Sequence, residues 1–224
     1  MGQAIGEMLP LAIGIAISPL PIIAIILMLI TPKARSNGLA FLGGWMLGLA
    51  VVGTVVLIVA DTAGIAMSSG PSRTVSLIKL VLGLLLLVVA WRQFGKRPKP
   101  GAEAPLPKWM RALDSFTPTR SLAIGALLSG VNPKNFILNA TAAAGIAQAG
   151  LAGAQQAVVL IVLVIIGSLG IIAPVGVYFA MGDKAAPVLG SWKTWLAANN
   201  ATVMMVLFLV FGVTLIGKGI SGLS

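Results

Sequence analysis

The residues best suited to chemistry in this chain lie at two places where proline interrupts an apolar run. The first interruption reads Ser18-Pro19-Leu20-Pro21, in which Ser18 can cap a restarting helix and Pro19 suits its first position. Pro19 and Pro21 remove two backbone donors and clash with the preceding turn, so a continuous helix must break or kink there. The sequence therefore predicts two half-helices that meet inside one apolar span.

A second interruption repeats this device later in the chain. Gly130 can close one half-helix, Asn132 can cap the next and Pro133 suits its first position. Lys134 follows directly, and an ionisable side chain inside an apolar span is a candidate functional group because burial of its charge is costly. The alternative is that the apolar stem of Lys134 carries its ammonium group to the cytoplasmic interface.

The chemistry that these two breaks favour is the binding of an anionic or polar head group. Each restarted helix directs unpaired N–H groups and a partly positive end toward the bilayer interior, and Lys134 adds a full charge. Asn132, Asn135 and Asn139 share one helical face, which should line the bundle interior or a wet cavity. Hydrogen bonding between helices is the alternative role for these amides. The predicted substrate-binding residues are Ser18, Pro19, Pro21, Asn132, Pro133, Lys134, Asn135 and Asn139.

The composition excludes several kinds of catalytic and metal site. The chain contains no Cys and no His, so it has no disulfide, no thiolate or imidazole metal site and no Ser-His-Asp triad. A phosphate-binding P-loop is also missing, so any energy must come from a gradient or a partner. We therefore predict a protein that is not an enzyme and that needs no metal and no cofactor.

The elements that must position these residues are membrane-spanning helices. The 224 residues are 58% hydrophobic and 9% charged, against about 25% charged in soluble domains. This composition predicts an all-α polytopic membrane protein with one domain over residues 1–224. Within the second apolar run, Gly43, Gly44 and Gly48 should let another helix approach closely. The six predicted transmembrane helices lie near residues 4–30, 38–60, 74–91, 121–148, 156–181 and 200–217.

The two halves of the chain resemble each other. "LAIGIAISPLP" in the first span matches "LAIGALLSGVNP" in the fourth, the second and fifth spans each end in Asp, and "LVLG" in the third matches "LVFG" in the sixth. Three crossings reverse the direction of the second copy, so the order of these matches predicts inverted repeats with broken helices 1 and 4. Chance similarity between apolar segments is the alternative. Repeat one would cover about 1–91, a basic linker about 92–120 and repeat two about 121–224.

The distribution of charge predicts the orientation in the membrane. The chain has 15 basic and 5 acidic residues, and most of the basic ones lie in the first, third and fifth connections. Because basic connections stay in the cytoplasm, both termini should lie outside and linker 92–120 inside. The linker also contains proline, Glu103 and Asp114, which argue against a dedicated polybasic stripe. No nucleic-acid partner is predicted.

Three motifs together resemble a known family of membrane proteins. "SPLP" in the first span, "FLGGW" in the second and "NPKN" in the fourth resemble the lysine-exporter (LysE) superfamily. Within it the chain looks most like the GAP family, also called Sap-like or SfLAP, of glycolipid-addressing membrane proteins. The resemblance covers essentially the whole chain and implies a small exporter of the plasma (inner) membrane. By motif match it carries a functional role to Ser18, Pro19, Pro21, Asn132, Pro133 and Lys134.

The sequence therefore favours a transporter that moves, or helps to move, envelope lipids or glycolipids through a midplane site at the two breaks. Its expected partners are membrane lipids, with an anionic lipid or a glycolipid as cargo. One alternative is an exporter of amino acids or other small solutes, and another is a membrane scaffold for an envelope-lipid assembly. A groove open to lipid would favour the first hypothesis, and a sealed polar cavity the second. The existence of a homo-oligomer or of a complex with envelope-lipid machinery is left open.

Overall fold

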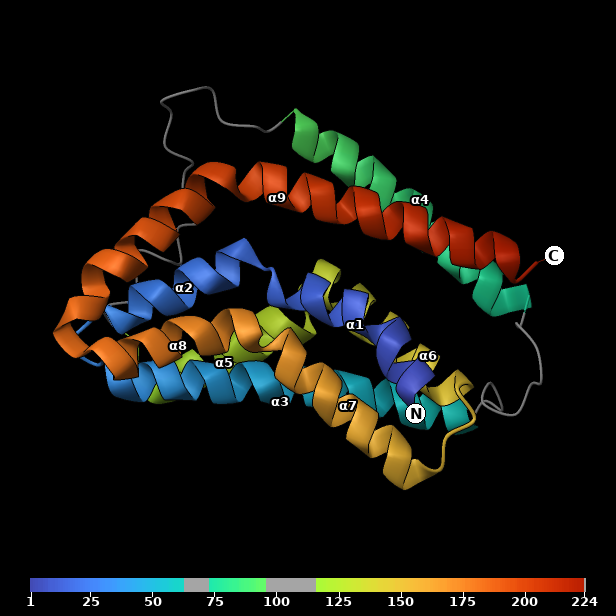
Figure 1. Cartoon of the computed structure of the whole chain (residues 1–224), viewed down its shortest axis with the longest axis horizontal. Coiled ribbons are helices and arrows are strands. Elements are labelled where there is room, and N and C mark those ends of the chain that lie inside the picture. The colour runs from blue at the N-terminus through green and yellow to red at the C-terminus, as the bar shows by residue number, and fades with distance from the viewer. Residues whose placement is uncertain (63–72, 96–115, 224) are drawn as a thin grey trace.

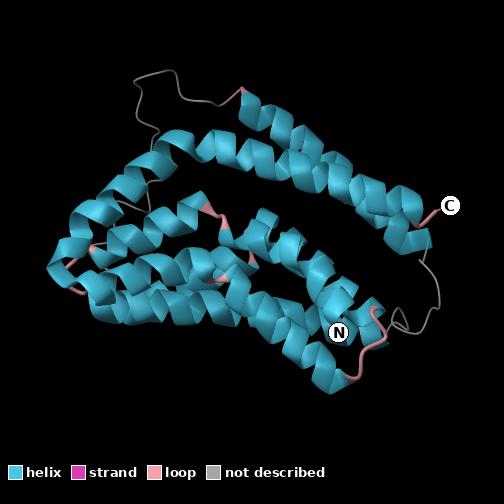
Figure 2. Ribbon diagram, in the orientation of Figure 1, coloured by secondary structure: helices cyan, strands magenta, loops and turns pink. Residues whose placement is uncertain are grey.

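A computed structural model describes residues 1–62, 73–95 and 116–223 of the chain. The described residues form nine α-helices and one short 3-10 helix, without a strand (Figure 2), so the predicted all-α class is confirmed for them. The helices are α1 (Gly2–Ala16), α2 (Pro19–Leu29), α3 (Ala34–Thr62), α4 (Arg73–Phe94), α5 (Pro118–Gly130), α6 (Pro133–Gln148), α7 (Gly153–Gly167), α8 (Leu169–Met181), η2 (Gly182–Lys184) and α9 (Ala185–Ser221).

Several of these helices are long and apolar enough to cross a membrane. Three do so by themselves, namely α3, α4 and α9, and the bent pairs α1–α2 and α7–α8 raise the number of candidate spans in the described residues to five. The protein is therefore a multi-pass membrane protein with three to five candidate spans. The α5–α6 pair, which corresponds to the predicted fourth span, is not among these candidates.

The predicted helix breaks are present at both proline motifs. The chain bends by 53° between α1 and α2, and α5 ends at Gly130 before α6 restarts at Pro133. Asn132 caps α6 as predicted, since its Oδ1 accepts a hydrogen bond from the Lys134 backbone N–H at 3.1 Å. Ser18 occupies the N-cap position of α2 and Pro19 its first position, as predicted, but the Ser18 side chain makes no capping hydrogen bond to α2.

The fifth predicted span contains a break that we did not predict. The chain bends by 57° between α7 and α8, where Ser168 Oγ donates back to Val164 O at 2.6 Å. Trp45 of α3 is fully buried, and its Nε1 donates to Gly167 O at this break, at 3.3 Å. A tertiary contact thus satisfies a carbonyl group at the break.

The last helix is longer than the predicted span 200–217. Residues 185–199, which we expected to be a connection, form the first half of the 37-residue helix α9. Pro187 lies in its first turn, where a missing N–H costs no helical hydrogen bond. In Figure 1, α9 curves past α8 and then runs beside α4. Most of the predicted linker, residues 96–115, lies outside the described residues.

The helices pack in two groups. Helices α4 and α9 lie along each other, whereas α1, α3, α5, α6 and α7 pack together in the other group (Figure 1). At the α4–α9 contact, a Cβ added to Gly83 would lie 2.8 Å from Gly212 O, and one added to Gly212 would lie 3.0 Å from Gly83 O. The matched glycines of the two predicted repeats therefore face each other.

The α3–α5 contact depends on glycine in the same way. A Cβ on Gly44 would overlap the Leu122 carbonyl, and one on Gly48 would meet the Ala126 carbonyl at 2.6 Å. Gly43, in contrast, has no atom within 4 Å of a Cβ position. The predicted close approach is confirmed for Gly44 and Gly48 and is wrong for Gly43.

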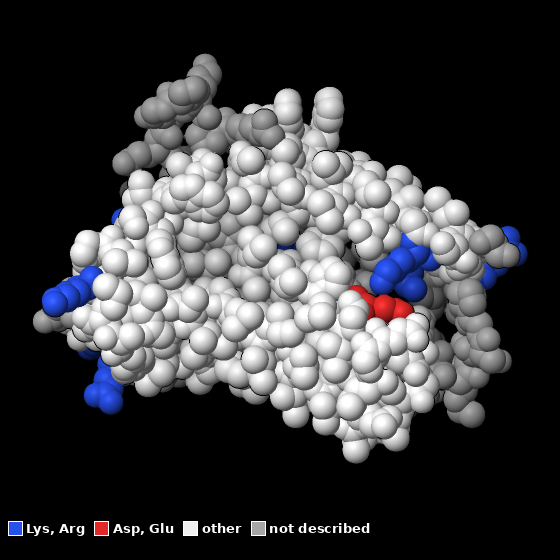
Figure 3. Space-filling model, viewed as in Figure 1, with Lys and Arg blue, Asp and Glu red and all other residues white. Residues whose placement is uncertain are grey.

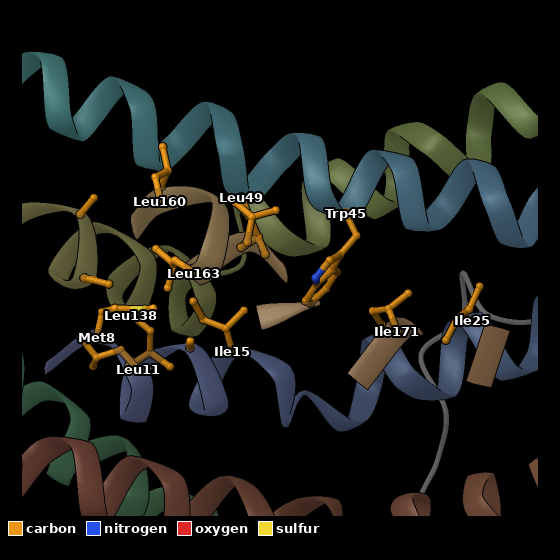
Figure 4. Packing of buried hydrophobic residues seen from close by; sticks show 14 of the residues in the cluster. Met8, Leu11, Ile15, Ile25, Trp45, Leu49, Leu138, Leu160, Leu163 and Ile171 are labelled. Atoms are coloured by element: carbon orange, nitrogen blue, oxygen red, sulfur yellow. The ribbon is translucent and has the colours of Figure 1, made fainter. Parts of the chain in front are cut away.

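The main apolar core lies where α1, α3 and α6 meet the bent α7–α8 pair. In Figure 4, side chains from α1, α3, α6 and α7 point toward one another around Ile15, Leu49, Leu138 and Leu163, all of which are at most 1% exposed. This core surrounds the breaks and holds their polar groups in fixed positions.

Candidate functional site

The two broken helices meet at the side chain of Lys134. Its Nζ donates to Gly14 O at 2.7 Å, to Ile17 O at 3.0 Å and to Ser18 Oγ at 2.7 Å. An ammonium group has three donors, so these contacts use all of them. Lys134 is only 6% exposed, so it does not extend to the interface as the alternative interpretation required.

The position of Lys134 follows from the break itself. The last carbonyl groups of a helix have no partner within that helix, and they give its C-terminal end a partly negative charge. The break leaves such carbonyls at the end of α1, inside the protein, and Lys134 at the start of α6 supplies the donors. The lysine therefore caps the C-terminal end of α1 and joins the two broken helices.

Ser18 and Asn135 extend this contact to a third helix. Ser18 Oγ lies 2.7 Å from Ile15 O and 3.1 Å from Asn135 Oδ1, and its one hydrogen can be donated to either acceptor. Asn135 Nδ2 donates to Leu128 O of α5 at 2.9 Å. We call Ser18, Lys134 and Asn135 the break junction, because they connect α1, α5 and α6.

The remaining predicted asparagines lie apart from the break junction. Asn139 is fully buried and its Nδ2 donates to Leu49 O of α3 at 2.9 Å, whereas its Oδ1 is a buried acceptor without a protein partner. Asn132 caps its own helix. The alternative role of hydrogen bonding between helices therefore describes the contacts of Asn135 and Asn139.

The restarted helix ends offer few donors to an anion. In the first turn of α2, Pro19 and Pro21 have no N–H, which leaves Leu20 as the only donor among the first three residues. In α6, Pro133 has none and the Lys134 N–H is already bonded to Asn132. The structure thus brings Ser18, Lys134 and Asn135 together, while cargo binding by the eight predicted residues stays a prediction.

A second polar region, which the sequence analysis did not find, lies between the two groups of helices. A cavity of about 790 Å³ separates α1 and α6 from the ends of α4 and α9, and Glu7, Lys79 and Lys218 contribute to its wall. Figure 3 shows acidic and basic side chains meeting beside a hollow at the end of the molecule that carries both termini. Only the two proline motifs were predicted as a site, although Lys79 lies within predicted span 74–91.

A third region is an apolar groove of about 570 Å³ between α2, α8 and α9. Two of its side chains, Trp192 and Trp195, are exposed, at 38% and 59%. The groove is lined by Ile22, Gly170, Ala173, Pro174, Ser191, Trp192, Trp195 and Leu196.

The fold and the break junction define the class of this protein as a helical multi-pass membrane protein whose broken helices meet at a buried polar contact. The family model described as "Sap, sulfolipid-1-addressing protein" (SfLAP) matches residues 8–221. The chain therefore belongs to the SfLAP family, as its motifs predicted. No curated protein and no solved structure matches the chain.

Proposed function

We propose that this protein moves, or helps to move, an envelope lipid across the inner membrane or toward its outer face. The observation that carries the proposal is the SfLAP match over residues 8–221, because the family description refers to the addressing of a sulfolipid. The cavity between the two groups of helices supports it, since its wall combines charged with apolar side chains, as an amphiphile requires.

The break junction is the central contact of the proposed transporter. Lys134 bonds α6 to α1, so these helices cannot separate unless the ammonium group exchanges its partners. An anionic head group that reached the junction would compete with the α1 carbonyls for Lys134. We therefore assign a role in cargo passage to the predicted residues Ser18, Pro19, Pro21, Asn132, Pro133, Lys134, Asn135 and Asn139.

We further propose six spans arranged as two inverted repeats, within the LysE superfamily. Two observations support this arrangement. Both proline motifs break their helices at corresponding positions, and the matched Gly83 and Gly212 face each other across the α4–α9 contact. In this arrangement α5 and α6 together form the fourth span.

The proposed orientation places both termini outside and the connection after α2 in the cytoplasm. Because the chain has no Cys, single cysteines report position without background labelling. Ser36 and Gly2 are both exposed. In spheroplasts, an impermeant maleimide should label Gly2→Cys but should label Ser36→Cys only after permeabilisation, and the reverse pattern would contradict the orientation.

Proteoliposomes that contain a fluorescent sulfated glycolipid test the proposed movement. The parent protein should transfer the lipid between leaflets faster than empty vesicles do, and Pro133→Ala should slow transfer more than it lowers the amount of inserted protein. Pro10→Ala is the matched control, since Pro10 lies inside α1 away from the break. Lipid transfer at the rate of empty vesicles would contradict the proposal.

The same vesicles separate the two alternative functions. Uptake of an amino acid without lipid transfer would support an exporter of small solutes. A scaffold would move neither substrate, and the closed state of the break junction, in which all three Lys134 donors are used, is the observation that favours it.

A further inference from the structure

We infer that the cavity between α1, α4, α6 and α9 binds the sulfate or phosphate ester of an anionic amphiphile, and that Lys79 and Lys218 hold this group. The choice of a lipid as ligand rests on the proposed function. The site differs from the break junction in every residue, so the two can be tested separately.

The two lysines belong to the same wall of the cavity. Lys79 lies on α4 and Lys218 on α9, and these helices pack along each other. The charge of Lys218 acts on Lys79 as a repulsion, whereas Glu7 of α1 attracts it from the opposite wall. Among the described residues of the wall, Glu7 is the one carboxylate against two ammonium groups, and it also accepts a hydrogen bond from Gln3 at 3.2 Å. An anion between the lysines would relieve their repulsion.

The rest of the wall indicates that this anion belongs to an amphiphile. The apolar side chains of Ala4, Met8, Leu11 and Ala142 line the α1 and α6 side of the cavity. Neutral polar side chains complete the wall, namely Gln3, Thr141 and Gln148. Free sulfate would leave the apolar wall uncovered, whereas a lipid places acyl or backbone carbons against it and can direct sugar hydroxyls to the amides.

The cavity is also large enough for more than a small ion. Its volume of about 790 Å³ lies in the range of roughly 300–1,000 Å³ that is usual for organic ligands. Gly145 and Gly217 contribute to the wall, and a Cβ added to either would have no atom within 4 Å. A larger side chain at these positions would enter open space without disturbing a helix contact, so the cavity can be filled without changing its charges.

Binding is measured on the full chain in phosphatidylcholine nanodiscs. The probes are sulfated galactosylceramide and its unsulfated parent, which differ only in the sulfate ester, together with phosphatidylglycerol and inorganic sulfate. We expect the sulfated lipid to bind at least about tenfold more tightly than its parent, because hydrogen bonds to charged groups are the stronger class. Phosphatidylglycerol should compete with it, and inorganic sulfate should do so only weakly.

Variants connect this binding to the cavity. Lys79→Gln combined with Lys218→Gln should weaken binding of the sulfated lipid about tenfold or more, and the corresponding double change to Arg should restore most of it. Gly145→Leu should weaken binding while both lysines remain. The matched controls are Lys33→Gln on the exposed connection and Gly176→Leu in α8, where a Cβ also has no atom within 4 Å.

Three results would overturn the inference. They are parent-like affinity in the lysine double variant, equal affinity for the sulfated lipid and its parent, and equal affinity for inorganic sulfate and the sulfated lipid. The last result would leave an anion site without a lipid. If the lysine double variant does not fold, Gly145→Leu carries the test.

The lipid-transfer assay separates this inference from the proposed function. Parent protein that binds the sulfated lipid in the cavity but does not transfer it would contradict the proposed function and support the inferred site. Normal transfer together with parent-like binding by the lysine double variant would support the function and overturn the inferred site.

Discussion

Lys134 at the break junction and the lysine pair in the cavity differ in what surrounds their ammonium groups. Lys134 is buried, and its three donors meet two backbone carbonyls and one hydroxyl. Lys79 and Lys218 instead border a cavity, and Glu7 is the one carboxylate among the described residues of its wall. A lysine with all its donors used fixes two helices relative to each other, whereas lysines beside open space are available to a ligand.

The glycines at the α3–α5 contact and at the cavity differ in the space around their Cβ positions. Gly44 allows α3 to touch α5, and a Cβ there would overlap backbone atoms. Gly145 borders the cavity and has open space where a Cβ would stand. The α3–α5 contact therefore has no room for a larger side chain, whereas the cavity between α6 and α9 has room for one or for a ligand. The tight helix contact and the inferred ligand site therefore lie in different parts of the molecule.

The largest effect is expected for Lys134→Met, which tests whether the break junction is a structural contact. The variant leaves the Gly14 and Ile17 carbonyls without their donor, so it should lower the free energy of unfolding by about 3 kcal/mol or more. Thermal unfolding in detergent, followed by circular dichroism, measures the loss. Lys79→Met should leave the stability nearly unchanged, because Lys79 borders the cavity.

Equal stability of these two variants would remove the distinction between the two regions. A stable Lys134→Met that no longer binds the sulfated lipid would move the anion site from the cavity to the break junction. Lys134→Arg is a useful companion, since it keeps the charge but replaces a compact ammonium with a planar group that cannot reproduce all three contacts.

Smaller changes in the free energy of unfolding are expected at the glycines, and they differ in sign between positions. Gly44→Ala should destabilise the protein by about 1–3 kcal/mol because its methyl group has no space at the α3–α5 contact. Gly43→Ala, one residue earlier on the same helix, and Gly145→Ala at the cavity should stabilise it by up to about 0.5–1 kcal/mol through helix propensity. Thermal unfolding at matched lipid content measures all three.

The outcome at Gly145 has a clear control in Gly43, because both helical glycines have open space around the Cβ position. Destabilisation by Gly145→Ala but not by Gly43→Ala would show that the cavity wall is packed more tightly than the structure indicates. It would also weaken the use of Gly145→Leu as a filling variant.

Much of the break region could be predicted from residue types alone. Pro19, Pro21 and Pro133 cannot continue a helix, so the two breaks and the family resemblance were readable in the sequence. The hydrogen-bond partners of Lys134 could not be predicted from the sequence, because the carbonyls of Gly14 and Ile17 are backbone groups, which no residue type marks. The sequence therefore predicted which residues lie at the break junction, but not which groups they bond to.

The cavity and the third break were harder to predict for a different reason. Lys79 and Lys218 are distant in sequence and come together only through the packing of α4 on α9. The break before Leu169 has no proline beside it, since Pro174 lies inside α8, and the Trp45 indole that bonds to it comes from α3. Both features depend on tertiary contacts, which residue spacing within one helix does not encode.

The smallest losses of stability are expected at the two buried asparagines, and their order tests the description of the break junction. Asn135 donates to Leu128 O and lies 3.1 Å from Ser18 Oγ, so Asn135→Ala should lower the free energy of unfolding by about 1–2 kcal/mol. Asn139 makes one hydrogen bond and keeps an unpaired Oδ1, so Asn139→Ala should cost only about 0.6 kcal/mol.

The two alanine variants lose the same atoms on the same helix, so their difference isolates the hydrogen bonds. Steric trapping in bicelles resolves free energies of this size under conditions that keep the helices inserted. A larger loss at Asn139 would mean that its Oδ1 has a partner in the membrane, and the polar face of α6 would then extend beyond the break junction toward Leu49. A loss confined to Asn135 would instead limit the polar contact between the two broken helices to Ser18, Lys134 and Asn135.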